Sequence, residues 1–227
     1  MKDPTRIPKL LGQVQDLWEA LPQLDFADLL RLLDNSGVGG LDDADAAEAL
    51  QQLCQRYPRT VQHTSVAVTV RTQEHLLSLD AETVVVRSSH ARAAQRPVTW
   101  ALDEVIKAEV GAPLILRDTT GIRRRFGVVE QIRPLIDAPK LSLTHLPALD
   151  RRTLGEDSFV VSCEGDVTVS LAHALRTFHQ QRRNTTMTEL PWDLVLPTAV
   201  GEQLVVQLRD GGGNVDLGRI TAITRAS

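Results

Sequence analysis

The sequence predicts an α+β protein in which a helical N-terminal segment precedes two related strand–helix–hairpin units. Within the first 57 residues the apolar side chains recur at spacings of three and four, which is typical of amphipathic helices. After Pro58 they alternate with a period of two, which is typical of half-buried strands. Two later stretches, 75–132 and 145–223, carry similar phrases in the same order and indicate a duplication.

The first helix is expected around one continuous apolar stripe. Pro8 lies in its first turn, where a missing backbone N–H costs nothing. Leu21 and Pro22 end the pattern. The stripe predicts a helix of about three turns and comprises Ile7, Leu10, Leu11, Val14, Leu17 and Trp18.

Two shorter helices complete the N-terminal segment. Asp25 is the expected N-cap of the second helix, and Asp42 or Asp43 that of the third, because a carboxylate there accepts from free backbone N–H groups. Pro58 ends the third helix. A bundle this small needs support from the rest of the chain or from a partner. Its predicted core includes Leu10, Leu17, Trp18 and Leu30.

Each later unit is predicted to contain a strand, a helix and a hairpin. The spacing of Leu102, Val105 and Ile106 predicts a helix over 99–109 in the first unit. A helix over 167–178 is predicted in the second. The remaining predictions for the first unit are strands 66–70 and 83–86, a polar loop 88–97, and a hairpin of 114–116 and 126–132 around a turn at 118–121. Those for the second are a strand 158–162 and a hairpin of 204–208 and 215–223 around a turn at 210–213.

The duplication is aligned at a separation of about 70 residues at first and of 91 at the end. His75 matches His145 at a separation of 70, Val98 matches Val167 at 69, and Gly127 matches Gly218 at 91. The larger separation at the end implies an insertion of about twenty residues near 176–198 in the second copy. The alternative is chance, because units rich in Val, Leu and Ala resemble one another. The expected domains are 1–58, 62–140 and 141–227.

Charge and composition narrow the classes of function. The net charge is −4, and residues 1–57 hold five Lys or Arg against ten Asp or Glu, so the rest of the chain is nearly neutral. Such a balance disfavours a dedicated nucleic-acid binder. The chain shows neither a signal peptide nor an apolar run of 18 residues, so we expect a cytoplasmic protein without a membrane partner. The excess of Arg over Lys is typical of a GC-rich bacterial genome. Cys54 and Cys163 are expected to be reduced thiols.

Two resemblances bear on the repeated units and the helices. The phrase from Pro113 to Asp118, followed by Gly121 and by Gly127-Val128-Val129, resembles a CBS repeat, over about 150 residues of the chain. The resemblance implies two tandem copies that bind an adenine nucleotide in a shared cleft. The threonine of that family has a match in Thr221, but its ribose-binding aspartate has none, so the implied binding favours base and phosphate over ribose. The helical segment around Trp18 and Pro22 to Phe26 resembles one found in assorted bacterial proteins, which implies no chemistry.

The second hairpin also supports a different interpretation. Residues 200–211 with Gly218-Arg219-Ile220 are similar to the bent strands of small Sm-like or SH3-like barrels. Such barrels bind RNA or peptides through a basic or aromatic face, and this segment carries neither.

The basic clusters supply the candidate ligand-binding residues. Arg123 and Arg125 share one face of a predicted strand, and Arg182 lies in a second cluster. With Thr221 they make the set of candidates, although arginines beside a turn also suit a solvated hairpin tip. The six histidines form no metal-binding motif, Asp118 to Gly121 is a turn, and no catalytic constellation, metal site or cofactor motif is found.

The sequence therefore favours a non-catalytic protein that binds a protein partner or a small ligand, such as a nucleotide, between its two related units. A nucleic-acid-associated protein that uses the arginine clusters is the alternative, and an enzyme of unknown type is third. The oligomeric state stays open, with a homodimer as one option.

Overall fold

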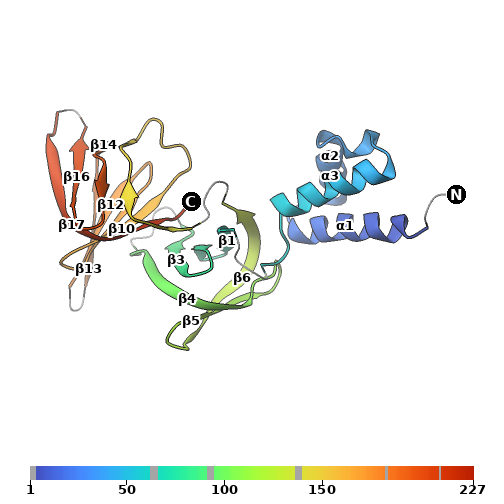
Figure 1. Cartoon of the computed structure of the whole chain (residues 1–227), viewed down its shortest axis with the longest axis horizontal. Helices are drawn as coiled ribbons and strands as arrows, with labels where there is room; N and C mark the ends of the chain where they lie inside the picture. The colour runs from blue at the N-terminus through green and yellow to red at the C-terminus, as the bar shows by residue number, and fades with distance from the viewer. Residues whose placement is uncertain (1–3, 62–65, 91–94, 136–139, 182–183, 210) are drawn as a thin grey trace.

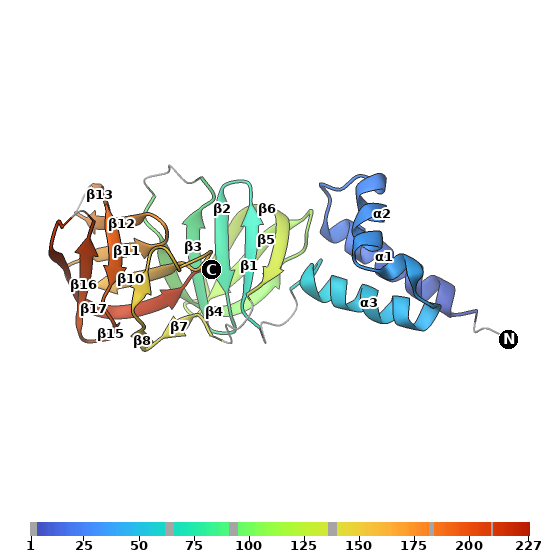
Figure 2. The same ribbon diagram turned by 90° about the horizontal axis from the view of Figure 1, so that it is seen from above.

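The computed structural model describes residues 4–61, 66–90, 95–135, 140–181, 184–209 and 211–227. It shows a helical bundle, a closed barrel and a second β unit that follow one another in a row (Figures 1 and 2). In these residues no helix follows Arg56, and β-strands dominate the rest. The predicted α+β class with two strand–helix–hairpin units is therefore wrong.

The helical bundle contains α1 (Arg6–Ala20), α2 (Phe26–Asn35), a short 3-10 helix η1 (Val38–Gly40) and α3 (Asp43–Arg56). The Asp25 carboxylate accepts from the Asp28 N–H at 2.8 Å, and that of Asp42 accepts from the N–H groups of Ala44 and Asp45, so both predicted caps are confirmed. The bundle core comprises Leu17, Leu21, Leu29, Leu50 and Leu53.

Only part of the predicted bundle core is buried. Leu17 is fully buried, and Leu10 packs against the edge of the core. Trp18 and Leu30 are 38% and 49% exposed, so their predicted burial is wrong. Three helices of this length enclose only one shared apolar face, so further apolar side chains of α1 and α2, Trp18 and Leu30 among them, stay at the surface.

The first β unit is a six-stranded antiparallel barrel that closes where β6 pairs with β1. Its interior is apolar and includes Val70, Leu77, Leu114, Leu116 and Ile132. The strands are β1 (Val68–Thr72), β2 (His75–Leu79), β3 (Thr83–Ser88), β4 (Val98–Lys107), β5 (Pro113–Asp118) and β6 (Arg123–Pro134).

The predicted helix over 99–109 is strand β4. Its pairing with β5 shifts register between Leu102 and Glu104 and again between Val105 and Lys107. Each irregularity adds a residue to the strand, so inward positions that would be two apart become three apart. Leu102, Val105 and Ala108 thus imitate helical spacing while they face the barrel core.

The second β unit forms one sheet that curls around its own core. The sheet order is β13-β12-β11-β10-β17-β16-β14-β9, with β7 beside β17, and β8 pairs separately with β15. Strands β13 and β14 lie near opposite ends of the sheet order, but in the sequence only Pro191 separates them. This short connection brings the two ends of the sheet together. The bounds are β7 (Ser142–Leu143), β8 (His145–Leu146), β9 (Leu149–Asp150), β10 (Phe159–Cys163), β11 (Val167–Leu171), β12 (Leu175–Gln180), β13 (Thr185–Leu190), β14 (Trp192–Val195), β15 (Thr198–Ala199), β16 (Gln203–Leu208) and β17 (Asn214–Arg225).

The predicted helix over 167–178 is the β11–β12 hairpin. Val169 and Leu171 face the core from β11, and Leu175 and Phe178 are buried on β12 after a bend at 172–174. The bend separates the apolar residues of β11 from those of β12 by four positions, from Leu171 to Leu175. The combined spacing of the apolar residues therefore resembles that of a helix. The hairpins predicted around 118–121 and 210–213 are confirmed as β5–β6 and β16–β17.

The two β units are the same fold, aligned differently from the prediction. Strands β1, β2, β3, β5 and β6 correspond to β10, β11, β12, β16 and β17, and β4 corresponds to β13 together with β14. The irregularity at Arg71/Thr72 recurs at Ser162/Cys163, 91 positions later. That at Leu102/Glu104 recurs at Trp192/Leu194, 90 positions later.

Single backbone hydrogen bonds recur as well. Gly111 donates to the Val129 carbonyl, and Gly201 donates to that of Ile220, both at 2.8 Å. The separation stays near 90 in all these pairs, so the matches at 70 and 69 and the insertion near 176–198 are wrong. His75, in β2, corresponds to Val167 in β11 and not to His145.

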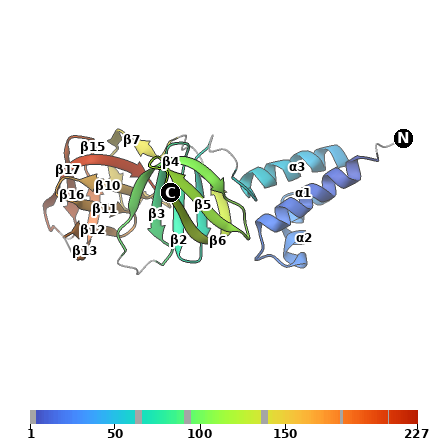
Figure 3. The ribbon, with the colours of Figure 1, turned by 90° about the horizontal axis from the view of Figure 1, so that it is seen from below.

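The two β units pack through different faces. The outer side of β2 and β3 in the first unit contacts β10, β17 and the C-terminus of the second (Figure 3). The shared apolar cluster contains Ala67, Val85, Leu141, Val160 and Ala226.

Polar groups fix this contact. Asp80 accepts from the N–H of Leu141 at 2.6 Å. Arg87 donates to the Ser158 hydroxyl at 2.7 Å and to the Ala226 carbonyl. Burial lowers the pKa of the Arg87 guanidinium to about 10. The β units are therefore held in one arrangement.

Arg59 ties the helical bundle to the first barrel. Its guanidinium lies 2.5 Å from the Glu19 carboxylate on α1 and 2.9 Å from that of Glu109, which follows β4. Val61 then donates to the Ala108 carbonyl at 2.9 Å. The bundle is thus attached at a definite edge of the barrel, beside the β6 strand.

Candidate partner-binding groove

The outer face of the β1–β6 pair carries the most distinctive surface of the chain. In β1, Val68 and Val70 point into the barrel, so Thr69 and Arg71 point outward. In β6, Ile132 points inward, which leaves its neighbours Gln131 and Arg133 outside. Arg71 pairs in register with Gln131, and Thr69 pairs with Arg133.

Three hollows meet at this face. They have volumes of about 520, 320 and 540 Å³, and Gln131 lines all three. Arg133 lines the first two, and Arg71 lines the last two. We call this combined surface the β1–β6 groove; its floor is Thr69, Arg71, Gln131 and Arg133.

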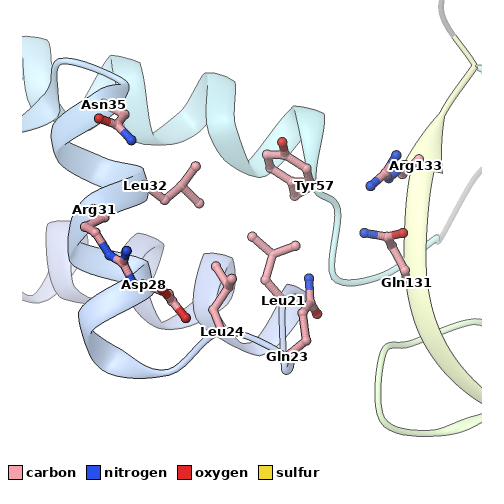
Figure 4. A pocket seen from close by; sticks show the side chains of 10 residues that line it. All are labelled: Leu21, Gln23, Leu24, Asp28, Arg31, Leu32, Asn35, Tyr57, Gln131 and Arg133. Atoms are coloured by element: carbon pink, nitrogen blue, oxygen red, sulfur yellow. Dashed lines mark hydrogen bonds and ion pairs between the residues drawn. The ribbon is translucent and has the colours of Figure 1, made fainter.

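The walls of the groove come from all three structural units. Figure 4 shows Gln131 and Arg133 projecting from β6 toward Leu21 and Tyr57 of the helical bundle. The opposite wall consists of Glu156, Asp157, Arg225 and Ser227 of the second β unit. The third hollow is bordered by Pro22, Gly111 and the half-exposed Val128. Leu24, Leu76 and Leu135 add apolar surface.

The floor offers positive charge. Arg71 and Arg133 are exposed, and in the part of the chain that the structure describes neither forms an ion pair. By contrast, Arg225 lies 2.6 Å from the Asp157 carboxylate, and Arg31 pairs with Asp28. The wall arginines are therefore neutralised within the chain, while the two floor arginines can receive an external anion.

The same face of the second unit is already an interface. Val160 and Thr224 pair in the second unit as Thr69 and Arg133 pair in the first. Val160 and Ala226 belong to the apolar cluster between the β units, and Thr224 lines a hollow against β3 and β4. In the second unit this face thus docks onto the first barrel. In the first unit it remains open and carries arginines.

The predicted site residues do not converge. Arg123 and Arg125 are exposed at the start of β6, opposite Arg117 and Ile115 of β5, and they border none of the groove hollows. Arg124, between them, pairs with Asp118 at 2.8 Å and lies over the Trp100 ring. Arg182 lies outside the described residues.

Thr221 does border a hollow between the two β units. This hollow has a volume of about 360 Å³ and includes Glu82, Trp100 and Thr224 in its lining. The Thr221 hydroxyl donates to the Ser162 carbonyl at 3.0 Å. Arg123 and Arg125 do not line it, so the predicted set of ligand-binding residues is not brought together.

Arg71 and Arg133 were missed in the sequence because each stands alone. Their difference from the second copy becomes visible only when the two repeats are aligned correctly. Arg71 then corresponds to Ser162, and Arg133 to Thr224. A charged residue in one copy where the other copy has a small polar one marks a surface with a separate use.

Comparisons with known proteins add little to this geometry. No family model and no curated protein matches the chain. Among solved structures, the β subunit of DNA polymerase from Streptococcus pyogenes is 9% identical over 71% of this chain and 56% of its own, with a TM-score of 0.12. A sliding clamp from Pseudomonas aeruginosa bound to griselimycin is 12% identical over 70% and 57%, also with a TM-score of 0.12. The chain thus spans just over half the length of these proteins, and likenesses this weak carry no argument.

The helices of the structure also bear on the membrane question. In the described ranges, none of them combines the length and the apolar content needed to cross a bilayer.

Proposed function

We propose that the protein is a non-catalytic binding protein whose protein partner occupies the β1–β6 groove. One observation carries the proposal: Gln131 lines three hollows, and the residues around them come from all three structural units. A small-molecule site is generally a single mostly apolar cavity. The groove is instead an open, mixed surface, in which a polar floor lies beside apolar wall residues such as Leu24 and Leu76. Protein interfaces are similarly mixed in polarity.

The repeat supports a partner at this face. The corresponding face of the second unit buries Val160 and Ala226 against the first barrel. A head-to-tail contact between similar units leaves one copy of each contact surface unused. The unused copy is the β1–β6 groove, and its arginines distinguish its occupant from the second unit.

Site-specific photocrosslinking tests the proposal. A photoreactive amino acid in place of Gln131 is expected to capture one discrete partner in the cells that naturally produce the chain. The same amino acid in place of Asn214, exposed on the second unit, is the matched control. Identical products from both positions, or none from Gln131, would contradict a partner site at the groove.

A small ligand in the hollow between the β units is the second candidate. Thr99 and Thr221, which line it, carry hydroxyl groups that could bond to a phosphate or sugar. A nucleotide at one hundred times its dissociation constant would stabilise the fold by about 2.7 kcal/mol. Thermal melts with AMP, ATP and S-adenosylmethionine test this, and an unchanged midpoint with all three at millimolar concentration would remove the candidate.

The proposal includes a cytoplasmic location. Both cysteines are free thiols, and burial raises the pKa of Cys163 to about 11. Unpaired cysteines suit a reducing compartment. Cell fractionation checks the location, and recovery of the chain outside the cytoplasmic fraction would contradict it.

A further inference from the structure

We infer that the occupant of the β1–β6 groove is an extended peptide segment with two carboxylates at alternate positions, acidic–x–acidic, held by Arg71 and Arg133. This inference rests on the proposed function and identifies the chemistry of the partner.

The spacing of the two arginines sets the spacing of the carboxylates. Arg71 stands opposite Gln131, and Arg133 is two residues further along β6, so the arginines are diagonal neighbours. Diagonal positions on adjacent antiparallel strands are about 7–8 Å apart. Alternate residues of an extended chain point to the same side and are about 6.6 Å apart. Two acidic side chains separated by one residue therefore match the floor.

The two floor arginines, unpaired among the described residues, favour carboxylates. Arginine presents a planar fork of donors that matches a carboxylate in a two-point contact. Gln131 is a neighbour of both arginines, opposite Arg71 and two residues before Arg133 on β6. It can bond to the peptide backbone, since its amide offers both a donor and an acceptor. Leu76 and Leu135 give apolar surface to the side chains that flank the acidic pair.

The same charges disfavour nucleic acid. Only two floor arginines are free of ion pairs among the described residues of the groove, whereas tight duplex binding generally uses about six to ten phosphate contacts. Glu130 and Glu156 lie at the rim and would repel a continuous phosphate chain. A short peptide needs only two cationic partners, so it avoids the first obstacle, and it brings fewer negative charges past Glu130 and Glu156 than a phosphate chain does.

A peptide series tests the inference with the full-length chain. The probe is a fluorescein-labelled nonapeptide of Thr and Val with Glu at its fourth and sixth positions. One control peptide has Glu at the fourth and fifth positions, which point to opposite sides of an extended chain, and another has Gln at the fourth and sixth. Fluorescence polarisation is expected to show binding about tenfold weaker for both controls, since charge-assisted contacts are lost.

Matched variants locate the binding. Arg71→Gln and Arg133→Gln should each weaken the probe about tenfold, as expected for one lost charge-assisted pair. Arg123→Gln and Arg125→Gln remove exposed arginines from the same strand β6 but outside the groove, and should change binding less than twofold. Circular dichroism confirms that each variant is folded.

Three results would overturn the inference. They are equal binding of the two Glu spacings, equal losses from Arg71→Gln and Arg125→Gln, and tighter binding of a labelled oligothymidylate than of the probe peptide. If Gln131 still captures a partner by photocrosslinking when the probe fails, only the acidic chemistry of the partner is refuted. If both fail, the groove is not a partner site.

Discussion

Asp118 ends strand β5 and organises the turn into β6. Its carboxylate accepts from the Thr120 hydroxyl at 2.6 Å and from the N–H groups of Thr120 and Ile122 at 3.0 Å. Arg124 adds two charged contacts on the other oxygen. The bond from Thr120, with those from Arg124 and the backbone, lowers the pKa of Asp118 from 3.8 to about 2. A single side chain thus holds the whole hairpin tip.

This residue gives the fold a defined pH dependence. A depressed pKa in the folded state means that Asp118 stabilises the protein above pH 3.8 and loses this effect as the pH falls toward 2. Asp118→Asn should lower the melting temperature at neutral pH, and the difference from the parent protein should shrink over that window. Thermal melts across pH measure it.

Asp103→Asn is the control for this prediction, because Asp103 is an exposed partner of Arg117. Exposed ion pairs generally contribute little to stability, so its melting temperature should barely change. A difference between parent and Asp118→Asn that stays constant down to pH 2 would contradict the prediction.

At the level of the helices, two neighbouring residues of α1 should differ sharply. Leu17 is fully buried in the bundle core, while Trp18 is 38% exposed and rests on Phe26 with a ring separation of 5.6 Å. Leu17→Ala should cost about 2–5 kcal/mol of unfolding free energy, as for buried leucines in general. Trp18→Ala should cost about 1 kcal/mol, the usual effect of a substitution outside a core. Urea unfolding followed by helical circular dichroism compares the two, and equal losses would show that Trp18 belongs to the core.

At the level of the strands, Gly111 and Gly201 should behave alike. Both lie at the start of corresponding strand pairs with φ of +83° and +93°, and an added Cβ would meet nothing within 4 Å. The left-handed backbone alone should make Gly111→Ala and Gly201→Ala cost about 1–2 kcal/mol each. Denaturant unfolding measures the losses.

Gly12→Ala is the opposite control, because Gly12 has ordinary helical surroundings with open space. Alanine in a helix interior generally gains about 0.5–1 kcal/mol over glycine. A costly Gly111→Ala beside a neutral Gly201→Ala would show that the two turns are not equivalent.

In the whole molecule, Asp80 couples the two β units. Its buried carboxylate accepts from the N–H groups of Glu82, Thr83 and Leu141 at 2.6–2.8 Å. Asp80→Ala leaves these donors unpaired, and should cost about 3 kcal/mol or more. Since the Leu141 contact reaches the segment that leads into the second unit, we expect the β units to unfold in one transition in the parent protein and in two in Asp80→Ala.

The control for this prediction is Glu82→Ala, at an exposed position whose carboxylate lies 3.4 Å from the Lys140 ammonium group. It should change the unfolding free energy by less than about 0.5 kcal/mol. Differential scanning calorimetry distinguishes one transition from two. A single, equally sharp transition in Asp80→Ala would mean that the apolar cluster alone holds the units together.

The sequence determined the elements whose signals are local. The three helices, the caps Asp25 and Asp42 and the two hairpins depend mainly on residues a few positions apart, and each was predicted correctly. The existence of a duplication was also visible, because glycines and turn residues recur at the ends of both copies. Apolar spacing failed where it was altered by a bulge in β4 and by the bend between β11 and β12.

Only the tertiary structure decided how the copies align and where a partner could bind. The strand pairings show that the two segments predicted as helices are strands. They also set the separation between the copies near 90, so the equivalent of His75 is Val167 and not His145. Arg71 and Arg133 are 62 positions apart, and they become neighbours because β6 returns to close the barrel against β1. Barrel closure is a long-range pairing, so no local pattern of residues could place these two charges on one floor.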